Sequence, residues 1–184
     1  MNKGTIITFA VVIAIFFLAG LYTYSIQHTA RVAEKDSEAS RTLTVSEEAP
    51  YTDLEGNPFS FDDYRGQVRV VNAWASWCPF CTNELADFEQ LAQEFSEQNV
   101  AVIAINRKEP RERAKHFLSS LGEFTYIDFA IDLSDAYYTS IGGFSMPETV
   151  FYDREGNIVI HKRGFMDIEE MRTLTNQAIT ALDK

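Results

Sequence analysis

Residues 68–81 read VRVVNAWASWCPFC, and they are the most informative part of the chain about its fold class. Its first seven residues form a mostly apolar run of strand length. A second apolar run at 100–105 has no polar face, which is typical of a buried parallel strand. The residues between the two runs, 78–97, have the periodicity of a helix. Cys78 and Cys81 therefore lie where a strand has ended and a helix begins, the edge at which open α/β sheets place their sites.

The rest of the domain continues this alternation. Residues 51–67 carry turn signals typical of short strands around a hairpin. Pro110 fits the first turn of another helix, whose expected apolar stripe is Ala114, Phe117, Leu118 and Leu121. We then expect a strand at 127–132, a short helix at 134–141, a hairpin of strands at 148–152 and 158–163, and a closing helix with the stripe Ile168, Met171, Leu174, Ala178 and Leu182. This order predicts an α/β domain with a central mixed sheet and helices on both faces.

The N-terminal region differs in composition from the rest. Residues 5–24 contain no charge and no proline, and a helix of that length spans about 30 Å, the hydrocarbon thickness of a bilayer. We expect a transmembrane anchor there, preceded by a short cytoplasmic N-terminus at 1–4. The alternative is a cleaved signal peptide, whose apolar region is usually shorter. Residues 25–50, rich in Ser, Thr, Glu and Ala, read as a flexible linker to the domain at 51–184.

Charge and cysteine content exclude several functions. The 184 residues carry a formal net charge of −11, almost all of it from the domain. Such an acidic domain lacks the basic face that holds a polyanion, so we expect no nucleic-acid partner. The chain has only 2 cysteines, which excludes a disulfide-rich scaffold and a four-cysteine metal site.

The motif Cys78-Pro79-Phe80-Cys81 predicts thiol–disulfide chemistry. At a helix start, backbone N–H groups and the positive end of the helix dipole face the first sulfur. They favour the Cys78 thiolate and lower its pKa, which makes Cys78 the expected nucleophile. Cys81, one turn further on, is then the resolving cysteine that would attack the mixed disulfide.

Three other interpretations compete with redox chemistry. A structural disulfide is possible, but closing a two-residue loop would stabilise the fold little. Half of a zinc site would need two more ligands, and the histidines available are not spaced as a pair: His28, His116 and His161. Copper(I) handling by the two thiols, with Met146, is the third alternative, because soft ligands suit that ion.

Several separated motifs resemble one family in the right order. They are residues 71–81 (VNAWASWCPFC), Glu84, residues 146–149 (MPET), and Asp153 with its glycine turn. Together they resemble the membrane-anchored thioredoxin-like proteins of the TlpA/ResA/CcmG (DsbE-like) type, over about residues 50–184. The resemblance implies a thioredoxin-like fold and an extracytoplasmic thiol–disulfide oxidoreductase at the cell membrane. It also implies that no metal or organic cofactor is needed.

The same resemblance suggests the partners. Members are generally reductants of protein disulfides, and CcmG-like members reduce apocytochrome c before haem attachment. A membrane thiol-electron donor would then restore the reduced pair. A general disulfide reductase, an oxidant and a copper(I)-binding module stay open as alternatives. Two residues between the cysteines argue against copper, because copper-delivery relatives usually have three.

Individual site residues follow from the matched motifs. The resemblance implies that Pro147 is a cis-proline facing the cysteines. Two positions depart from common patterns. Phe80 stands where the family often has proline, and Asn72 stands where ordinary thioredoxins carry a buried aspartate. The expected supporting residues are Trp77, Pro79, Phe80, Asn72, Met146 and Glu148.

Helix geometry indicates an acid for proton exchange. At about 100° per residue, Cys81 and Glu84 fall within the apolar arc of the helix at 78–97. The other acids of that helix lie outside the arc. A carboxyl on an apolar face prefers its neutral form, so we expect a raised pKa and proton exchange between Glu84 and Cys81. The alternative is an ordinary solvated surface acid.

Overall fold

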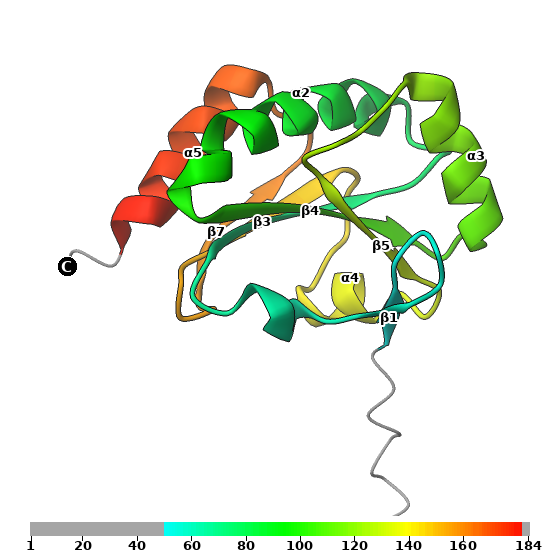
Figure 1. Ribbon diagram of the computed structural model, residues 1–184, viewed down its shortest axis with the longest axis horizontal. Coiled ribbons are helices and arrows are strands. Elements are labelled where there is room, and N and C mark those ends of the chain that lie inside the picture. Colours follow the sequence, from blue (N-terminus) through cyan, green and yellow to red (C-terminus); the bar gives the residue numbers. More distant parts are fainter. Residues whose placement is uncertain (1–49, 182–184) are drawn as a thin grey trace, which may run out of the picture. The chain divides into compact units, whose positions relative to one another are not determined.

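The computed structural model describes residues 50–181, and within them the strands form one seven-stranded sheet (Figure 1). The central strands run parallel, while the outer strands pair antiparallel, so the expected mixed sheet is confirmed. Across the sheet the order is β2 (Pro58–Phe59), β1 (Tyr51–Thr52), β5 (Asp128–Asp132), β4 (Val100–Arg107), β3 (Val68–Trp74), β6 (Glu148–Tyr152) and β7 (Ile158–Arg163).

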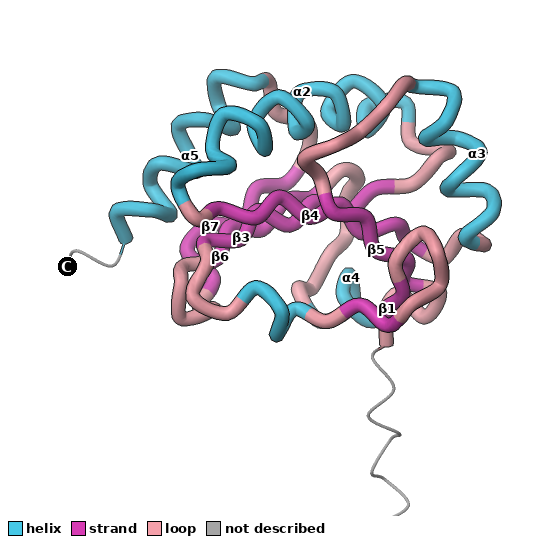
Figure 2. The backbone as a smooth tube through the Cα atoms, in the orientation of Figure 1, coloured by secondary structure: helices cyan, strands magenta, loops and turns pink. Residues whose placement is uncertain are grey.

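Helices cover both faces of this sheet (Figures 1 and 2). One face carries three helices: α2 (Pro79–Phe95), α3 (Arg111–Leu121) and α5 (Ile168–Thr180). The opposite face carries two short helices: α4 (Ala136–Ser140) and the 3-10 helix η1 (Phe61–Tyr64). A second 3-10 turn, η2 (Ser96–Gln98), follows α2. The two helical layers leave the sheet as the buried centre of the domain.

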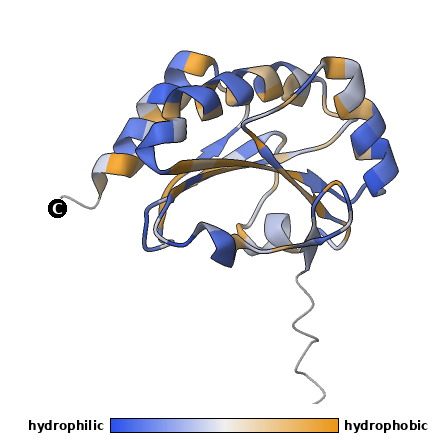
Figure 3. Ribbon diagram, viewed as in Figure 1, coloured by the Kyte–Doolittle hydropathy of each residue, from blue (hydrophilic) through white to orange (hydrophobic). Residues whose placement is uncertain are grey.

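Strand β3 shows why the sheet takes this central position. Its alternate residues Val70 and Trp74 join the apolar cluster under α2, α3 and α5. The intervening residues Val71 and Ala73 join the cluster on the α4 side. A strand buries both faces only between two layers, which is the reason for its nearly continuous apolar sequence. Figure 3 shows the apolar residues gathered along these central strands.

The helix stripes were predicted with one error. In α3, Ala114 and Leu118 are buried, and Phe117 is partly buried against the same cluster. Leu121, however, is 36% exposed, so its expected burial was wrong. It is the last residue of α3, and the chain turns away at Gly122, where φ is 130°.

The predicted anchor at 5–24 lies outside the described residues, as do nearly all of the linker and Leu182 of the closing helix. Among residues 50–181, no helix combines the length and the apolar character needed to cross a bilayer.

The strand register brings three connections to one edge of the sheet. Trp74, at the end of β3, pairs with Asn106 near the end of β4. Ala73 pairs with Glu148, the first residue of β6. The segments after β3, after β4 and before β6 therefore meet at this edge, and the cysteines lie in the first of them.

Candidate active site at the Cys78–Cys81 disulfide

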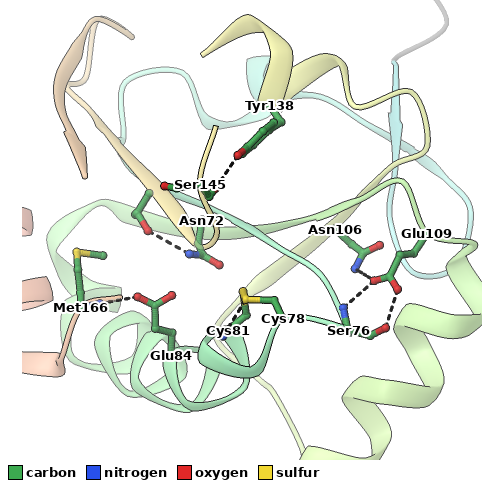
Figure 4. The surroundings of a disulfide bond; sticks show 11 residues. Asn72, Ser76, Cys78, Cys81, Glu84, Asn106, Glu109, Tyr138, Ser145 and Met166 are labelled. Carbon is green, nitrogen blue, oxygen red and sulfur yellow. Dashed lines mark hydrogen bonds between the residues drawn. A yellow bond between two sulfur atoms is a disulfide. The ribbon is translucent and has the colours of Figure 1, made fainter. Parts of the chain in front are cut away.

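The two cysteines form a disulfide at the start of α2 (Figure 4). Cys78 is the N-cap residue, and Pro79 occupies the first turn, where its missing N–H costs no helical hydrogen bond. The Cα atoms of Cys78 and Cys81 lie 5.4 Å apart. The backbone N–H of Cys81 donates to Cys78 Sγ at 3.3 Å. A helix N-terminus thus directs a backbone donor at the first sulfur, as the sequence predicted.

Exposure differs around the disulfide. Cys78 is 3% exposed, and Cys81 is completely buried. The side chains beside them are open to solvent: Trp77 is 59% exposed, Phe80 is 62% exposed, and Pro79 is also exposed. A thiol or disulfide that approaches the motif would therefore meet an apolar surface and reach Cys78 before Cys81.

Glu84 lies on the buried face of α2, one turn after Cys81. Its Oε1 accepts a hydrogen bond from the backbone N–H of Met166 at 2.7 Å. Its Oε2 is buried and has no hydrogen-bond partner among residues 50–181. Burial raises the pKa of Glu84 to about 8, while the hydrogen bond from Met166 acts in the opposite direction. The expected burial is confirmed, and at neutral pH this carboxyl is mostly protonated.

Asn72 lies within β3 and is completely buried. Its Nδ2 donates to Thr149 Oγ1 of β6 at 3.0 Å, across the β3–β6 pair. Its Oδ1 is buried without a partner in the described part of the chain. The Asn72 amide is neutral, and the ionisable side chain drawn next to it in Figure 4 is Glu84.

The Met146–Pro147 peptide bond is cis, the isomer that the resemblance implies. Pro147 is buried, and Met146 packs against the apolar cluster that contains both cysteines. The expected role of Pro147 in facing the cysteines stays a prediction.

Glu148 holds the segment that precedes this proline. Its Oε1 accepts hydrogen bonds from the backbone N–H groups of Phe144 at 2.9 Å and Ser145 at 2.7 Å. Its Oε2 lies 2.6 Å from Nε2 of His161. Burial alone would raise the pKa of Glu148, but these hydrogen bonds lower it below its ordinary value. Glu148 is therefore an ionised, fully bonded group, unlike Glu84.

Three contributors were missed in the sequence. Met166, from the segment before α5, supplies the donor to Glu84. Glu109 and Asn106, near the end of β4, form a buried polar pair beside Ser76. No short motif marks these residues, because the contacts of Met166 with Glu84 and of Glu109 with Ser76 join segments that are distant in the chain. The polar Asn106 and Glu109 directly after the apolar run at 100–105 are the one signal that could have indicated them.

The histidines considered as metal ligands are dispersed. His116 is exposed on α3, His161 is bonded to Glu148, and His28 lies outside the described residues. Within the described range, no three His, Cys, Asp or Glu side chains are grouped so that they could hold a metal ion.

Comparison with known proteins agrees with this geometry. The AhpC/TSA family matches residues 42–161. The thiol:disulfide interchange protein DsbE of Vibrio cholerae is 28% identical over 163 residues, covering 86% of this chain and 84% of the relative. The thiol-disulfide oxidoreductase ResA of Halalkalibacterium halodurans is 32% identical over 127 residues, covering 66% of this chain and 70% of the relative.

A solved structure shares the fold. It is a secreted Mycobacterium tuberculosis disulfide oxidoreductase, described as homologous to DsbE of E. coli. Its TM-score is 0.59 at 22% identity, covering 72% of this chain and 98% of that chain. With a family match over more than half of its length and a Cys-x-x-Cys disulfide at a helix start, this chain belongs to the AhpC/TSA family, as a thioredoxin-like thiol–disulfide oxidoreductase related to DsbE and ResA.

Proposed function

We propose that this protein reduces disulfides in exported proteins, with apocytochrome c as its substrate, while anchored to the outer side of the cell membrane by residues 5–24. The observation that carries the proposal is the Cys78–Cys81 pair at the start of α2, with a buried, mostly neutral Glu84 one turn further along the same helix. The resemblance to CcmG-like proteins supports the substrate and the location.

The reaction begins from the reduced pair. The Cys78 thiolate attacks one sulfur of the substrate disulfide, and the other substrate sulfur leaves as a thiolate and takes a proton. Cys81 then attacks Cys78 Sγ, which releases the second substrate thiol and forms the intramolecular disulfide. The substrate gains two electrons and two protons, and the cysteine pair loses them. A membrane dithiol donor reverses this change and restores the thiols.

We propose that Glu84 exchanges a proton with the buried Cys81 both when the substrate is reduced and when the cysteine pair is re-reduced. Cys81 is shielded from water, so its proton needs a nearby acceptor when the sulfur attacks. Because the pKa of Glu84 lies near ambient pH, a fraction of the carboxyl is ionised; this fraction accepts the Cys81 proton, and the protonated carboxyl returns it when Cys81 leaves during re-reduction. The unpartnered Oε2 is the atom available for this exchange.

Trapping of mixed disulfides tests the substrate and the order of attack. Cys81→Ala lacks the resolving sulfur, so it should accumulate covalent complexes, whereas Cys78→Ala should accumulate few. Apocytochrome c as the dominant trapped partner supports the proposal. A diverse set of exported proteins would instead indicate a general reductase, and equal trapping by both variants would contradict the assignment of Cys78 as nucleophile.

The direction of electron flow needs its own measurement. Known relatives of this fold span reduction potentials from about −270 to −120 mV. We expect a redox titration of the Cys78–Cys81 couple to fall in the reducing part of that range. A value near that of the strong oxidants would overturn the reductase assignment. Titration of the reduced protein with copper(I) tests the copper-binding alternative, which predicts that the two thiols bind the ion.

A further inference from the structure

Glu109 is a buried carboxylate beside the turn that leads to the disulfide. It lies in the connection between β4 and α3 and is 2% exposed. Its Oε2 accepts hydrogen bonds from the backbone N–H of Ser76 at 2.7 Å and from Asn106 Nδ2 at 2.9 Å. Its Oε1 accepts from Ser76 Oγ at 2.6 Å. Burying a carboxylate is costly without such partners. Two of the three bonds fix Glu109 to Ser76, and the third ties it to Asn106.

Ser76 lies close to the reactive cysteine along the chain. It lies two residues before Cys78, within a turn that closes where the Cys78 N–H donates to the Ala75 carbonyl at 3.0 Å. Trp77, between Ser76 and Cys78, is 59% exposed. Glu109 therefore binds both the backbone N–H and the side chain of Ser76 in this turn (Figure 4).

Two other buried glutamates near the disulfide also accept hydrogen bonds from backbone N–H groups. Glu148 binds the backbone N–H of Phe144, and Glu84 binds the backbone N–H of Met166. Each of these glutamates is buried, and each holds a segment that carries an exposed aromatic residue. Glu109 likewise holds the turn before Cys78 by accepting a hydrogen bond from its backbone.

We propose that Glu109 is a positioning residue for disulfide exchange, which holds Ser76 so that the turn presents Cys78 Sγ to the backbone donors at the start of α2. The inference rests on the proposed function, because it takes Cys78 as the attacking sulfur. Without the anchor, Cys78 Sγ would spend less time against those donors, and the reactive thiolate would be less favoured.

A purely structural role is the competing explanation, and the chain offers a matched control for it. Glu89 on α2 also anchors a loop through its carboxylate, which accepts from the backbone N–H groups of Thr125, Tyr126 and Ile127. Glu89 lies eight residues beyond Cys81, about 12 Å along the helix axis. Glu89→Ala therefore removes a similar anchor away from the reactive sulfur.

The test measures alkylation of Cys78 by iodoacetamide from pH 5 to 10 in the full chain. Every variant also carries Cys81→Ala, so that Cys78 is the only thiol. The charged groups near this turn are Glu109 and Arg113, whose Nη1 lies 3.9 Å from Glu109 Oε1. Glu84 from α2 is a further titratable group near the cysteines. With Glu109→Ala, we expect the midpoint of the pH profile to rise by about one pH unit, with a roughly tenfold slower rate below the midpoint.

The direction in which the midpoint shifts distinguishes the loss of the Ser76 anchor from the loss of the Glu109 charge. Removing a negative charge alone would favour the thiolate and move the profile to lower pH. Glu109→Gln isolates that effect, because its amide can still accept from the Ser76 N–H while donating to Ser76 Oγ. We expect Glu109→Gln to shift the midpoint downward or leave it unchanged, and Glu89→Ala to leave it unchanged.

The proposal is overturned if Glu109→Ala gives the same profile as Glu89→Ala or moves to lower pH. Should circular dichroism show that Glu109→Ala is unfolded, Ser76→Ala replaces it, since this change removes only the hydroxyl contact. It should shift the midpoint upward by a smaller amount, and an unchanged midpoint would overturn the proposal. Alkylation requires no protein substrate, so a failed substrate trap would contradict the proposed function without touching this result.

Discussion

Glu84 Oε1 accepts a hydrogen bond from the backbone N–H of Met166 at 2.7 Å, which joins α2 to the segment before α5 across 82 residues of sequence. The second oxygen of the same carboxyl, Oε2, is buried without a partner in the described range. One oxygen therefore holds the structure, while the other is available to gain and lose a proton. We expect this division to let Glu84 exchange a proton with Cys81 while its side chain stays fixed.

The first prediction concerns the rate of exchange. Glu84→Gln preserves an oxygen that can accept from Met166 but removes the titratable proton, so the fold should be retained. We expect disulfide exchange to slow by at least about tenfold, because positioned acid–base groups contribute this much or more. The inflection near pH 8 should also disappear.

Stopped-flow exchange kinetics from pH 5 to 9 measure this effect. Glu94→Gln is the matched control, because Glu94 is on the same helix and is bonded to Arg172 at the surface. It should behave as the unmodified protein does. If the Glu84→Gln rates equal those of the unmodified protein across this range, Glu84 takes no part in proton exchange.

The second prediction concerns stability and its dependence on pH. Burial raises the pKa of Glu84 from its ordinary 4.5 to about 8 in the folded protein. The folded state then binds more protons than the unfolded state between these values, so this contribution is complete below about pH 4.5 and is lost as pH rises through 8. Relative to Glu84→Gln, the unmodified protein should lose a few kcal/mol of unfolding free energy between pH 5 and 9. Urea denaturation at both pH values measures the difference, and parallel losses in the two proteins would contradict it.

The third prediction concerns an ion pair at the same sheet edge. Arg107 donates from Nε and Nη2 to the two oxygens of Asp135, each at 2.7 Å, and its guanidinium lies over the Tyr138 ring. The Arg107 hydrogen bond lowers the pKa of Asp135 against the opposing effect of burial. The stabilisation that this ion pair gives the folded protein is therefore present above the ordinary aspartate pKa. It is lost as pH falls through the lowered pKa of Asp135.

Asp135→Asn should cost about 3 kcal/mol at pH 7, because it leaves a mostly buried guanidinium without its counter-charge. Asparagine tolerates the left-handed backbone found at this position, where φ is 62°, so strain should not add to the cost. Chemical denaturation at pH 7 and pH 3 measures both effects. A loss below about 1 kcal/mol would show that the pair contributes no more than a surface ion pair.

The fourth prediction concerns the anchor. The apolar segment at 5–24 should remain uncleaved, with the domain outside the cytoplasmic membrane. Protease added to spheroplasts should then remove the domain and leave a membrane-bound fragment, while a cytoplasmic marker protein stays intact. Full protection of the domain would contradict this topology.

The elements that the sequence predicted well depend on local spacing. The burial of Glu84 follows from its position three residues after Cys81, because helical periodicity alone places both on the apolar face. The strands 148–152 and 158–163 were predicted at their observed bounds, since the turn between them is marked by its sequence.

The contacts that were missed depend on neighbours distant in the chain. The bond from Ser76 to Glu109 spans 33 residues and exists because β3 and β4 end side by side. The bond from Met166 to Glu84 depends on how α5 packs against α2. No periodicity within either segment indicates such a pairing. The burial of Cys81 and Glu84 could therefore be predicted, while the contacts of Ser76 and Met166 could not.

The last prediction concerns the apolar surface beside the disulfide. Trp77 and Phe80 flank Cys78 and are more than half exposed, and exposed apolar groups at a reactive centre mark a surface that binds other molecules. Phe80→Ser should therefore slow the reduction of a protein disulfide by about tenfold, a loss of about 1.4 kcal/mol that is ordinary for an interface aromatic. Reduction of a small disulfide such as oxidised glutathione should change less than about twofold, because it needs little of that surface. Ile158→Ser is the control, since Ile158 is 54% exposed but lies far from the cysteines, at the other end of the sheet, where it pairs with Tyr152. If Phe80→Ser slows both substrates equally, Phe80 acts on the chemistry of the cysteine pair and not on substrate binding.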